Sequence, residues 1–217
     1  MSQKPGGSSP TVRPVSPLSR SESQARTRRM LVETASAMFL RDGYAATSLE
    51  KVAEEAGFSK GAVYSNFDGK DDLCLAVLET IHAEVAEAVL GSLRGAATVE
   101  QALGAFDQWA DARLGDPDWS ALEAEFAARS RRDPRLRAAL EERNVRIRGI
   151  IAEALRTTCE EHGLDLAMEP ADAANALFSL GIGLGLQRAI DPGLPVHALS
   201  DVVRVLAGMP VPARLRT

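Results

Sequence analysis

Residues 47–70, TSLEKVAEEAGFSKGAVYSNFDGK, constrain this chain most, because they predict two short helices joined by a tight turn. Thr47 and Glu50 have the spacing of a capping box, which begins a helix. Gly57 follows the last apolar residue of that helix and can close it in the left-handed conformation. Ser59 then caps the second helix. The inward positions follow the helical period and are Leu49, Val52, Ala53, Ala56, Val63 and Phe67.

The outward edge of the second predicted helix has no evident role in a hydrophobic core. It consists of Lys60, Gly61, Ala62, Tyr64, Ser65 and Asn66. Lysine binds phosphate or guanine, small residues let a helix backbone come close, and hydroxyl and amide groups donate to phosphates and base edges. These residues suit a DNA groove, while an ordinary solvated helical hairpin would explain the spacing alone.

A longer pattern covers residues 26–78. Its positions, in order, are Met38-Phe39, Gly43-Tyr44, Thr47, Ala56-Gly57, Ser59-Lys60-Gly61, Tyr64, Phe67, Lys70 and Leu73. With these residues at these spacings, the segment resembles the DNA-binding domain of the tetracycline-repressor (TetR) family of bacterial regulators. Asn66 and Gly69 differ from the residues that are usual in that family at these two positions. The resemblance implies DNA contacts from Thr47, Ser48, Ser59, Lys60, Gly61, Ala62, Tyr64, Ser65, Asn66 and Lys70.

The remaining chain shows helical periods and no alternating strand, so we predict an all-α fold of about nine helices. The expected helices cover about 24–41, two segments within 48–67, and then 70–91, 98–114, 119–132, 134–162, 170–189 and 195–206. We divide the chain into an N-terminal arm (1–22), a three-helix, helix-turn-helix DNA-binding domain (23–70) and a helical effector-binding and dimerisation domain (71–217), which includes the connecting helix.

The arm, residues 1–22, is rich in Ser, Pro and Gly and is expected to be disordered. Five arginines in the arm and just beyond it could contact phosphates or a minor groove, namely Arg13, Arg20, Arg26, Arg28 and Arg29. For residues 1–18 the alternative is a linker without function. Residues 1–70 hold 10 Lys/Arg against 7 Asp/Glu, whereas residues 71–217 hold 15 against 23. The net charge of −5 therefore combines a basic N-terminal part with an acidic C-terminal part.

Gly181, Gly183 and Gly185 form a GxGxG run inside an apolar helical segment. A dinucleotide fingerprint requires a strand before the run and a turn at it, so we predict a helix-packing seam instead. The family resemblance implies a four-helix dimer interface there, although packing within one subunit would require the same residues. The interface candidates are Leu177, Gly181, Leu184, Gly185, Val202 and Leu206.

The resemblance also implies a small-molecule pocket between Val99 and Gln187. Its candidates are Phe106, Trp109, Trp119, Phe126, Asn175 and Phe178, although aromatic residues at helical spacing also serve as core. We expect a repressor that leaves a palindromic, double-stranded DNA operator when a small, mainly apolar effector binds. A helical DNA-binding adaptor whose second domain binds a protein is the alternative.

The sequence shows no constellation typical of an enzyme or a metal site. His82, His162 and His197 are scattered, and Glu123 and Glu125 fall on different helix faces, so we predict no catalytic residue, no cofactor and no metal. Cys74 and Cys159 are expected to be reduced thiols. No apolar run reaches the about 18 to 20 residues that span a bilayer, and no secretory signal is recognisable, so we expect a cytoplasmic homodimer without a membrane partner.

Overall fold

The computed structural model describes residues 19–94 and 96–213, and the regular structure within these ranges is entirely helical. The prediction of an all-α fold of about nine helices is confirmed. The helices of the described residues are α1 (Arg20–Ala46), α2 (Leu49–Glu55), α3 (Lys60–Tyr64), α4 (Lys70–Arg94), α5 (Val99–Arg113), α6 (Pro117–Ser130), α7 (Pro134–His162), α8 (Pro170–Arg188) and α9 (Ala198–Leu206).

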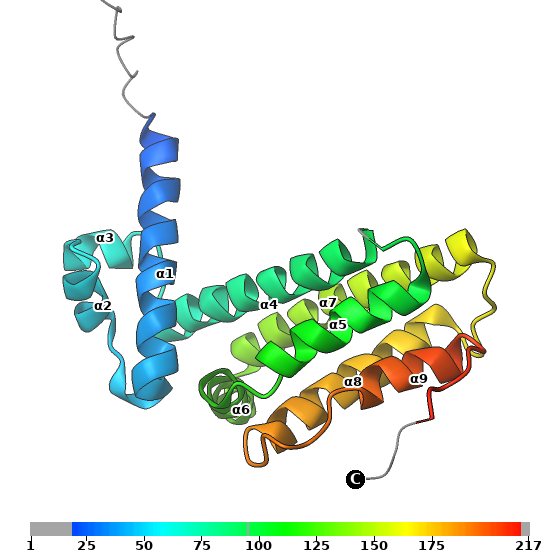
Figure 1. Cartoon of the computed structure of the whole chain (residues 1–217). Coiled ribbons are helices and arrows are strands. Elements are labelled where there is room, and N and C mark those ends of the chain that lie inside the picture. The colour runs from blue at the N-terminus through cyan, green and yellow to red at the C-terminus, as the bar shows by residue number, and fades with distance from the viewer. Residues whose placement is uncertain (1–18, 95, 214–217) are drawn as a thin grey trace, which may run out of the picture.

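The first three helices form a small group at one end of the molecule (Figure 1). From this group α4 runs into a bundle with α5, α7, α8 and α9, and α6 lies at the end of the bundle nearest α1 (Figure 1). None of the described helices is long and apolar enough to cross a membrane.

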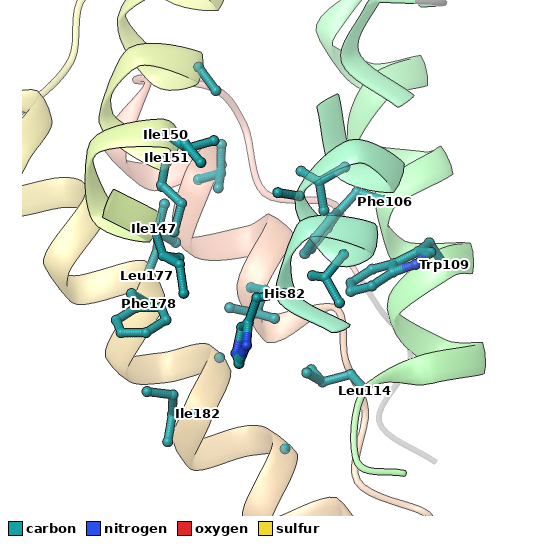
Figure 2. A pocket seen from close by; sticks show the side chains of 18 of the residues that line it. His82, Phe106, Trp109, Leu114, Ile147, Ile150, Ile151, Leu177, Phe178 and Ile182 are labelled. Carbon is teal, nitrogen blue, oxygen red and sulfur yellow. The ribbon is translucent and has the colours of Figure 1, made fainter. Parts of the chain in front are cut away.

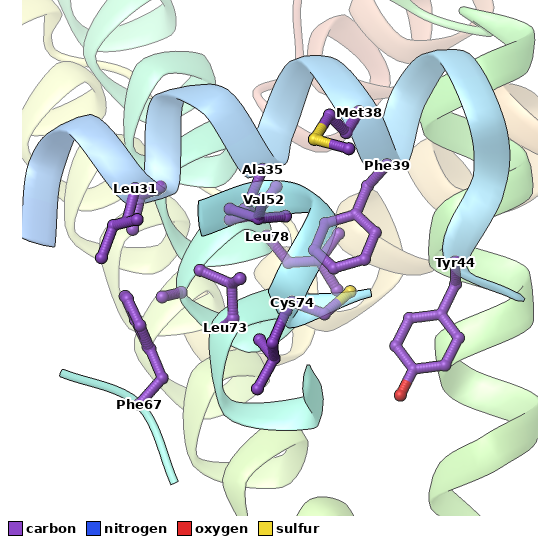
Figure 3. Packing of buried hydrophobic residues seen from close by; sticks show 14 of the residues in the cluster. Leu31, Ala35, Met38, Phe39, Tyr44, Val52, Phe67, Leu73, Cys74 and Leu78 are labelled. Atoms are coloured by element: carbon purple, nitrogen blue, oxygen red, sulfur yellow. The ribbon is translucent and has the colours of Figure 1, made fainter. Parts of the chain in front are cut away.

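One apolar core holds α1, α2 and α3 against the beginning of α4 (Figure 3). Leu31 and Phe39 of α1, Val52 of α2 and Val63 of α3 are buried in it, as the helical period predicts. Leu73, Cys74, Val77 and Leu78 of α4 are buried in the same cluster. Because α4 shares this core and then continues into the bundle, it connects the two parts of the molecule through packed side chains.

The start of α2 corrects a sequence prediction. Thr47 is only 2% exposed, and its hydroxyl donates to the carbonyl oxygen of Gly43 at 3.0 Å. Gly43 has a φ of 80° and breaks the helical geometry of α1, so the Thr47 hydroxyl closes the end of α1 rather than opening α2. Ser48 caps α2 instead by accepting from the Lys51 backbone N–H at 3.3 Å, and the predicted capping box of Thr47 with Glu50 is wrong.

The turn between α2 and α3 agrees with its prediction. Gly57 has a φ of 72°, the left-handed conformation that favours glycine, and the Phe58 backbone N–H donates to the Ala53 carbonyl at 2.8 Å. Ser59 caps α3 by accepting from the Ala62 backbone N–H at 3.2 Å. The predicted glycine closure and serine cap are both confirmed.

Three helix starts differ from those expected, and one is that of α6, which begins at Pro117 rather than at about residue 119 because Asp116 caps it. α1 begins at Arg20, because Ser19 and Glu22 form a capping box there. Residues 20–22 of the predicted disordered arm are therefore helical, and residues 1–18, with Arg13, lie outside the described residues. α9 begins at Ala198 rather than at Pro195, because residues 196–197 form a turn before it.

Two buried arginines connect α8 and α9 to α5 through hydrogen bonds. The apolar sequence pattern did not predict that these arginines are buried. Arg204 of α9 donates to Glu100 of α5 at 2.8 Å. Arg188 of α8 donates to the Leu114 carbonyl oxygen at 2.8 Å and to the Asp111 carbonyl oxygen at 3.1 Å. Each guanidinium is thus buried with hydrogen-bond acceptors, as a buried charge requires.

Candidate DNA-binding surface and ligand cavity

α3 presents the predicted polar edge to solvent. Ser59, Lys60, Gly61, Tyr64 and Ser65 are exposed, and Tyr64 is 54% exposed despite its large ring. The Tyr64 hydroxyl donates to Glu50 of α2 at 3.1 Å, and this hydrogen bond raises the pKa of Tyr64. The side chain is therefore held as a neutral hydrogen-bond donor beside Lys60.

Gly61 lies in the first turn of α3, where nothing inside the molecule requires a glycine. Its φ is not positive, and a Cβ placed on it would meet only the Ser59 hydroxyl oxygen, at 3.8 Å. A glycine within a helix costs stability relative to alanine. Packing within the protomer therefore does not explain why position 61 lacks a side chain. This favours the interpretation that an external partner approaches the helix backbone closely here.

Some of the predicted DNA contacts are occupied within the protomer. Asn66 donates its side-chain amide to the Ala62 carbonyl oxygen at 2.7 Å and so caps the end of α3. Lys70 donates to the Ala45 carbonyl oxygen at 3.3 Å and lies 4.1 Å from the centre of the Tyr44 ring. Thr47 is buried, so the expectation that it contacts DNA is wrong.

A cavity of about 450 Å³ lies within the bundle and is lined by residues of α4 to α9 and the loops between them. Five of the six predicted ligand-binding residues line it together, namely Phe106, Trp109, Trp119, Phe126 and Phe178. Figure 2 labels Phe106, Trp109 and Phe178 among them. Asn175 is exposed on α8 and is not among the residues that line this cavity. The prediction for Asn175 is therefore wrong, and ligand binding by the other five stays a prediction.

A polar cluster of His82, Glu123 and Arg143 interrupts the apolar lining. The His82 ring projects into the cavity (Figure 2). His82 Nε2 lies 3.2 Å from one carboxylate oxygen of Glu123, whose other oxygen accepts from Arg143 at 3.2 Å. Burial in the apolar cavity lowers the pKa of His82, which favours the neutral imidazole, and outweighs the opposing effect of Glu123.

Sequence reasoning missed this cluster because its three residues come from three separate helices, α4, α6 and α7. A signal was nevertheless available for Glu123 and Arg143. Glu123 comes three residues before the inward Phe126, and Arg143 comes three residues after the inward Leu140, so each is a charged residue on an apolar helix face.

α6 connects the wall of the cavity to the helix-turn-helix region. On one side Glu123 and Phe126 line the cavity. On the other side Arg129 donates to both carboxylate oxygens of Asp71 on α4, at 2.7 and 3.0 Å. Asp71 also accepts from the Tyr44 hydroxyl, and the Tyr44 ring lies 6.0 Å from that of Phe126. A displacement of α6 would therefore act on α1 and α4 directly.

The predicted dimer residues pack mainly inside the protomer. Leu177 and Leu206 are buried in one apolar cluster, against which Val202 packs. Leu184 and Gly185 are buried and Gly181 lines the cavity, which agrees with the alternative of packing within one subunit, and a dimer interface at the six residues stays a prediction. The exposed large apolar side chains of this region are instead Ile182, Leu186, Ile190 and Val205.

The described residues contain no group of three or more His, Cys, Asp or Glu side chains arranged to hold a metal ion. Cys74 and Cys159 are both free thiols and both buried. Burial raises the pKa of each thiol, which disfavours the reactive thiolate.

Comparison with known proteins decides the family. Residues 31–77 match the profile of "Bacterial regulatory proteins, tetR family", and residues 98–208 match that of "BetI-type transcriptional repressor, C-terminal". The chain belongs to the TetR family. The resemblance read from residues 26–78 is thereby confirmed, and a family of bacterial regulatory proteins agrees with the expectation of a regulator rather than an enzyme.

Among curated TetR-family relatives, the regulator TtgR of Pseudomonas putida is 38% identical over 61 residues, which are 28% of this chain and 29% of TtgR. The repressor AcnR of Corynebacterium efficiens is 30% identical over 115 residues, 52% of this chain and 55% of AcnR. The chain thus spans less than two thirds of the length of these relatives.

Solved structures share the fold along most of the chain. Escherichia coli NemR in its reduced form is 23% identical, with 84% of this chain and 96% of NemR covered and a TM-score of 0.64. Bacillus subtilis FadR, solved in complex with stearoyl-CoA, is 15% identical, with 82% of this chain and 97% of FadR covered and a TM-score of 0.62. At these identities the likeness shows the TetR-family fold alone.

Proposed function

We propose that this protein acts in the bacterial cytoplasm as a homodimeric repressor that binds a palindromic operator and leaves it when a small, mainly apolar effector enters the bundle cavity. The observation that carries the DNA-binding part is the outward face of α3, with Lys60, Gly61 and Tyr64 on a surface that no part of the described chain covers. Lys60 would bind phosphate, Tyr64 would donate to phosphate or a base edge once its hydroxyl leaves Glu50, and Gly61 would let the helix backbone enter the groove.

A second copy of the chain is required for specificity, because one recognition helix reads only a few base pairs. Two copies related by a two-fold axis present their α3 helices to half-sites separated by about one helical turn or a multiple of it. The exposed apolar residues Ile182, Leu186, Ile190 and Val205 support pairing through α8 and α9, and Ile190 is 88% exposed in the protomer.

Release by an effector would use α6. Because this helix carries cavity residues on one side and Arg129 on the other, a ligand that shifts α6 would strain the bonds of Arg129 and Tyr44 to Asp71. Those bonds fix the beginning of α4 against α1, and so the position of α3. A ligand that prefers the displaced state by about 1.4 kcal/mol would shift the equilibrium away from the DNA-bound state tenfold.

The test begins with selection of genomic fragments that the purified protein retains, followed by gel shifts on an enriched fragment with and without apolar compounds. We expect a palindromic fragment, retention that requires Tyr64, and release by at least one compound that also raises the melting temperature. If the protein retains DNA fragments and no compound that stabilises the protein releases them, the result would favour the helical DNA-binding adaptor. Absence of any enriched fragment would refute the repressor.

A further inference from the structure

Two buried hydrogen-bond donors on the cavity wall have no acceptor. The indole N–H of Trp119 and the Nε–H of Arg143 are closed to solvent, and neither has a hydrogen-bond partner within the described chain. Trp119 belongs to α6 and Arg143 to α7, and both side chains line the cavity. A buried donor without a partner is unfavourable and rare in folded proteins. Both belong to side chains that line one cavity, which points to an occupant that supplies the acceptor once these side chains shift.

The charges around these donors decide what kind of acceptor fits. Among the described residues that line the cavity, charged side chains are provided by Glu123 and Arg143, which pair at 3.2 Å. Burial lowers the pKa of His82, and both ring nitrogens already face acceptors, Nδ1 the Leu78 carbonyl oxygen at 2.6 Å and Nε2 the Glu123 carboxylate at 3.2 Å. An anionic head group at this site would be repelled by the Glu123 carboxylate. A cationic head group would be repelled by the Arg143 guanidinium and would offer no acceptor to either free donor. An uncharged oxygen acceptor avoids both conflicts.

Resting on the proposed function of the cavity, we infer that the effector is an uncharged, mostly apolar molecule with a carbonyl-type oxygen that accepts hydrogen bonds from Trp119 and Arg143. The apolar body occupies the part of the cavity lined by Phe106, Phe178 and the isoleucines of α7 (Figure 2).

The arrangement also connects recognition to release. Both donor nitrogens are closed to a water molecule, so an oxygen reaches them only when side chains of the wall shift. The Trp119 ring packs edge-on against that of His82, with 5.8 Å between the ring centres. An oxygen entering next to Trp119 therefore presses on α6, the same helix that holds Asp71 through Arg129.

Four compounds with the same two-ring body and different polar groups separate the possibilities. They are benzophenone, with a carbonyl group; diphenylmethane, with none; diphenylacetate, an anion; and benzhydrylamine, a cation. Affinities are measured on the full chain by displacement of the uncharged dye N-phenyl-1-naphthylamine. We expect benzophenone to bind about tenfold more tightly than diphenylmethane, the effect of one net hydrogen bond, and more tightly than either ion.

Trp119→Phe should abolish the preference for benzophenone over diphenylmethane, read as the ratio of the two affinities within the same variant. Trp109→Phe is the matched control, because Trp109 lines the same cavity but its indole nitrogen is not among the buried atoms that lack a partner. Circular dichroism melting checks that both variants fold, and the comparison of the four compounds on the unchanged protein does not depend on either variant.

Equal binding of benzophenone and diphenylmethane, or tighter binding of either ion, would overturn this inference while leaving the cavity as an effector site. A benzophenone preference that survives in Trp119→Phe would overturn the assignment of the donors. If none of the four compounds displaces the dye, the inference fails, and gel shifts on the enriched operator then report separately whether the DNA-binding part of the proposed function stands.

Discussion

Substitution of Gly61 should change stability and DNA binding in opposite directions. Because a Cβ at this position meets only the Ser59 hydroxyl oxygen, at 3.8 Å, alanine fits without strain. Removing a helical glycine stabilises a protein by about 0.5 to 1 kcal/mol, which for a chain of this size raises the melting temperature by about 1 to 4 °C. Gly61→Leu should give a similar stability, since leucine also forms helices well.

Operator affinity should fall as the side chain at position 61 grows, because the helix backbone could no longer approach the groove. We expect a loss of a few-fold for Gly61→Ala and of at least about tenfold for Gly61→Leu, measured by fluorescence anisotropy on a labelled operator. Gly91→Ala is the control, because Gly91 is exposed within α4, a Cβ placed on it would meet no neighbouring side chain within 4 Å, and it lies outside α3. Unchanged affinity in Gly61→Leu would refute the placement of α3 in the groove.

Four further outcomes are expected. Tyr64→Ala should weaken operator binding about tenfold or more in gel shifts with an unchanged circular dichroism spectrum, and an unaltered midpoint would remove Tyr64 from the contact surface. Lys60→Ala should reduce the slope of log affinity against log salt by about one phosphate contact per protomer, whereas an identical slope would exclude that contact. Arg129→Ala should retain effector binding in dye displacement but uncouple it from operator release, and full release in this variant would contradict transmission through the Arg129–Asp71 bonds. Burial lowers the pKa of His82 below the value of 6.5 in the unfolded chain, so the stability that the neutral ring contributes is complete above that pH and is lost as the pH falls. His82→Gln should therefore flatten the pH dependence of the melting temperature between about pH 7.5 and 5.5. Parallel curves for the variant and the wild type would contradict this.

Helix positions were predictable because periodicity and caps are local. Proline and aspartate begin α7 where the sequence indicated, with Asp133 as the N-cap, whereas the same pair begins α6 two residues before the predicted start, with Asp116 as the N-cap. The error at Thr47 arose because Thr47 and Ser48 both carry a hydroxyl group that can cap the start of α2. Which of the two faces inward depends on the packing at the end of α1, where the Thr47 hydroxyl bonds to the Gly43 carbonyl oxygen.

The cavity was predictable in its aromatic lining and not in its polar part. Phe106 and Trp109 lie one turn apart on α5, so a single helix face brings them together. The cluster of His82, Glu123 and Arg143 depends on how three helices pack, which no local pattern specifies. The dimer residues stay a prediction for a related reason, because an apolar helix face has the same pattern whether it packs within a protomer or between two.

The most direct test of this account is the selection of genomic fragments by the wild-type protein and by Tyr64→Ala in parallel, with the enriched sites sequenced. The account predicts that the wild type enriches a palindrome whose half-sites lie about one helical turn apart and that the variant does not. Enrichment of the same sites by the variant, or of no site by the wild type, would contradict the claim that the exposed face of α3 reads DNA.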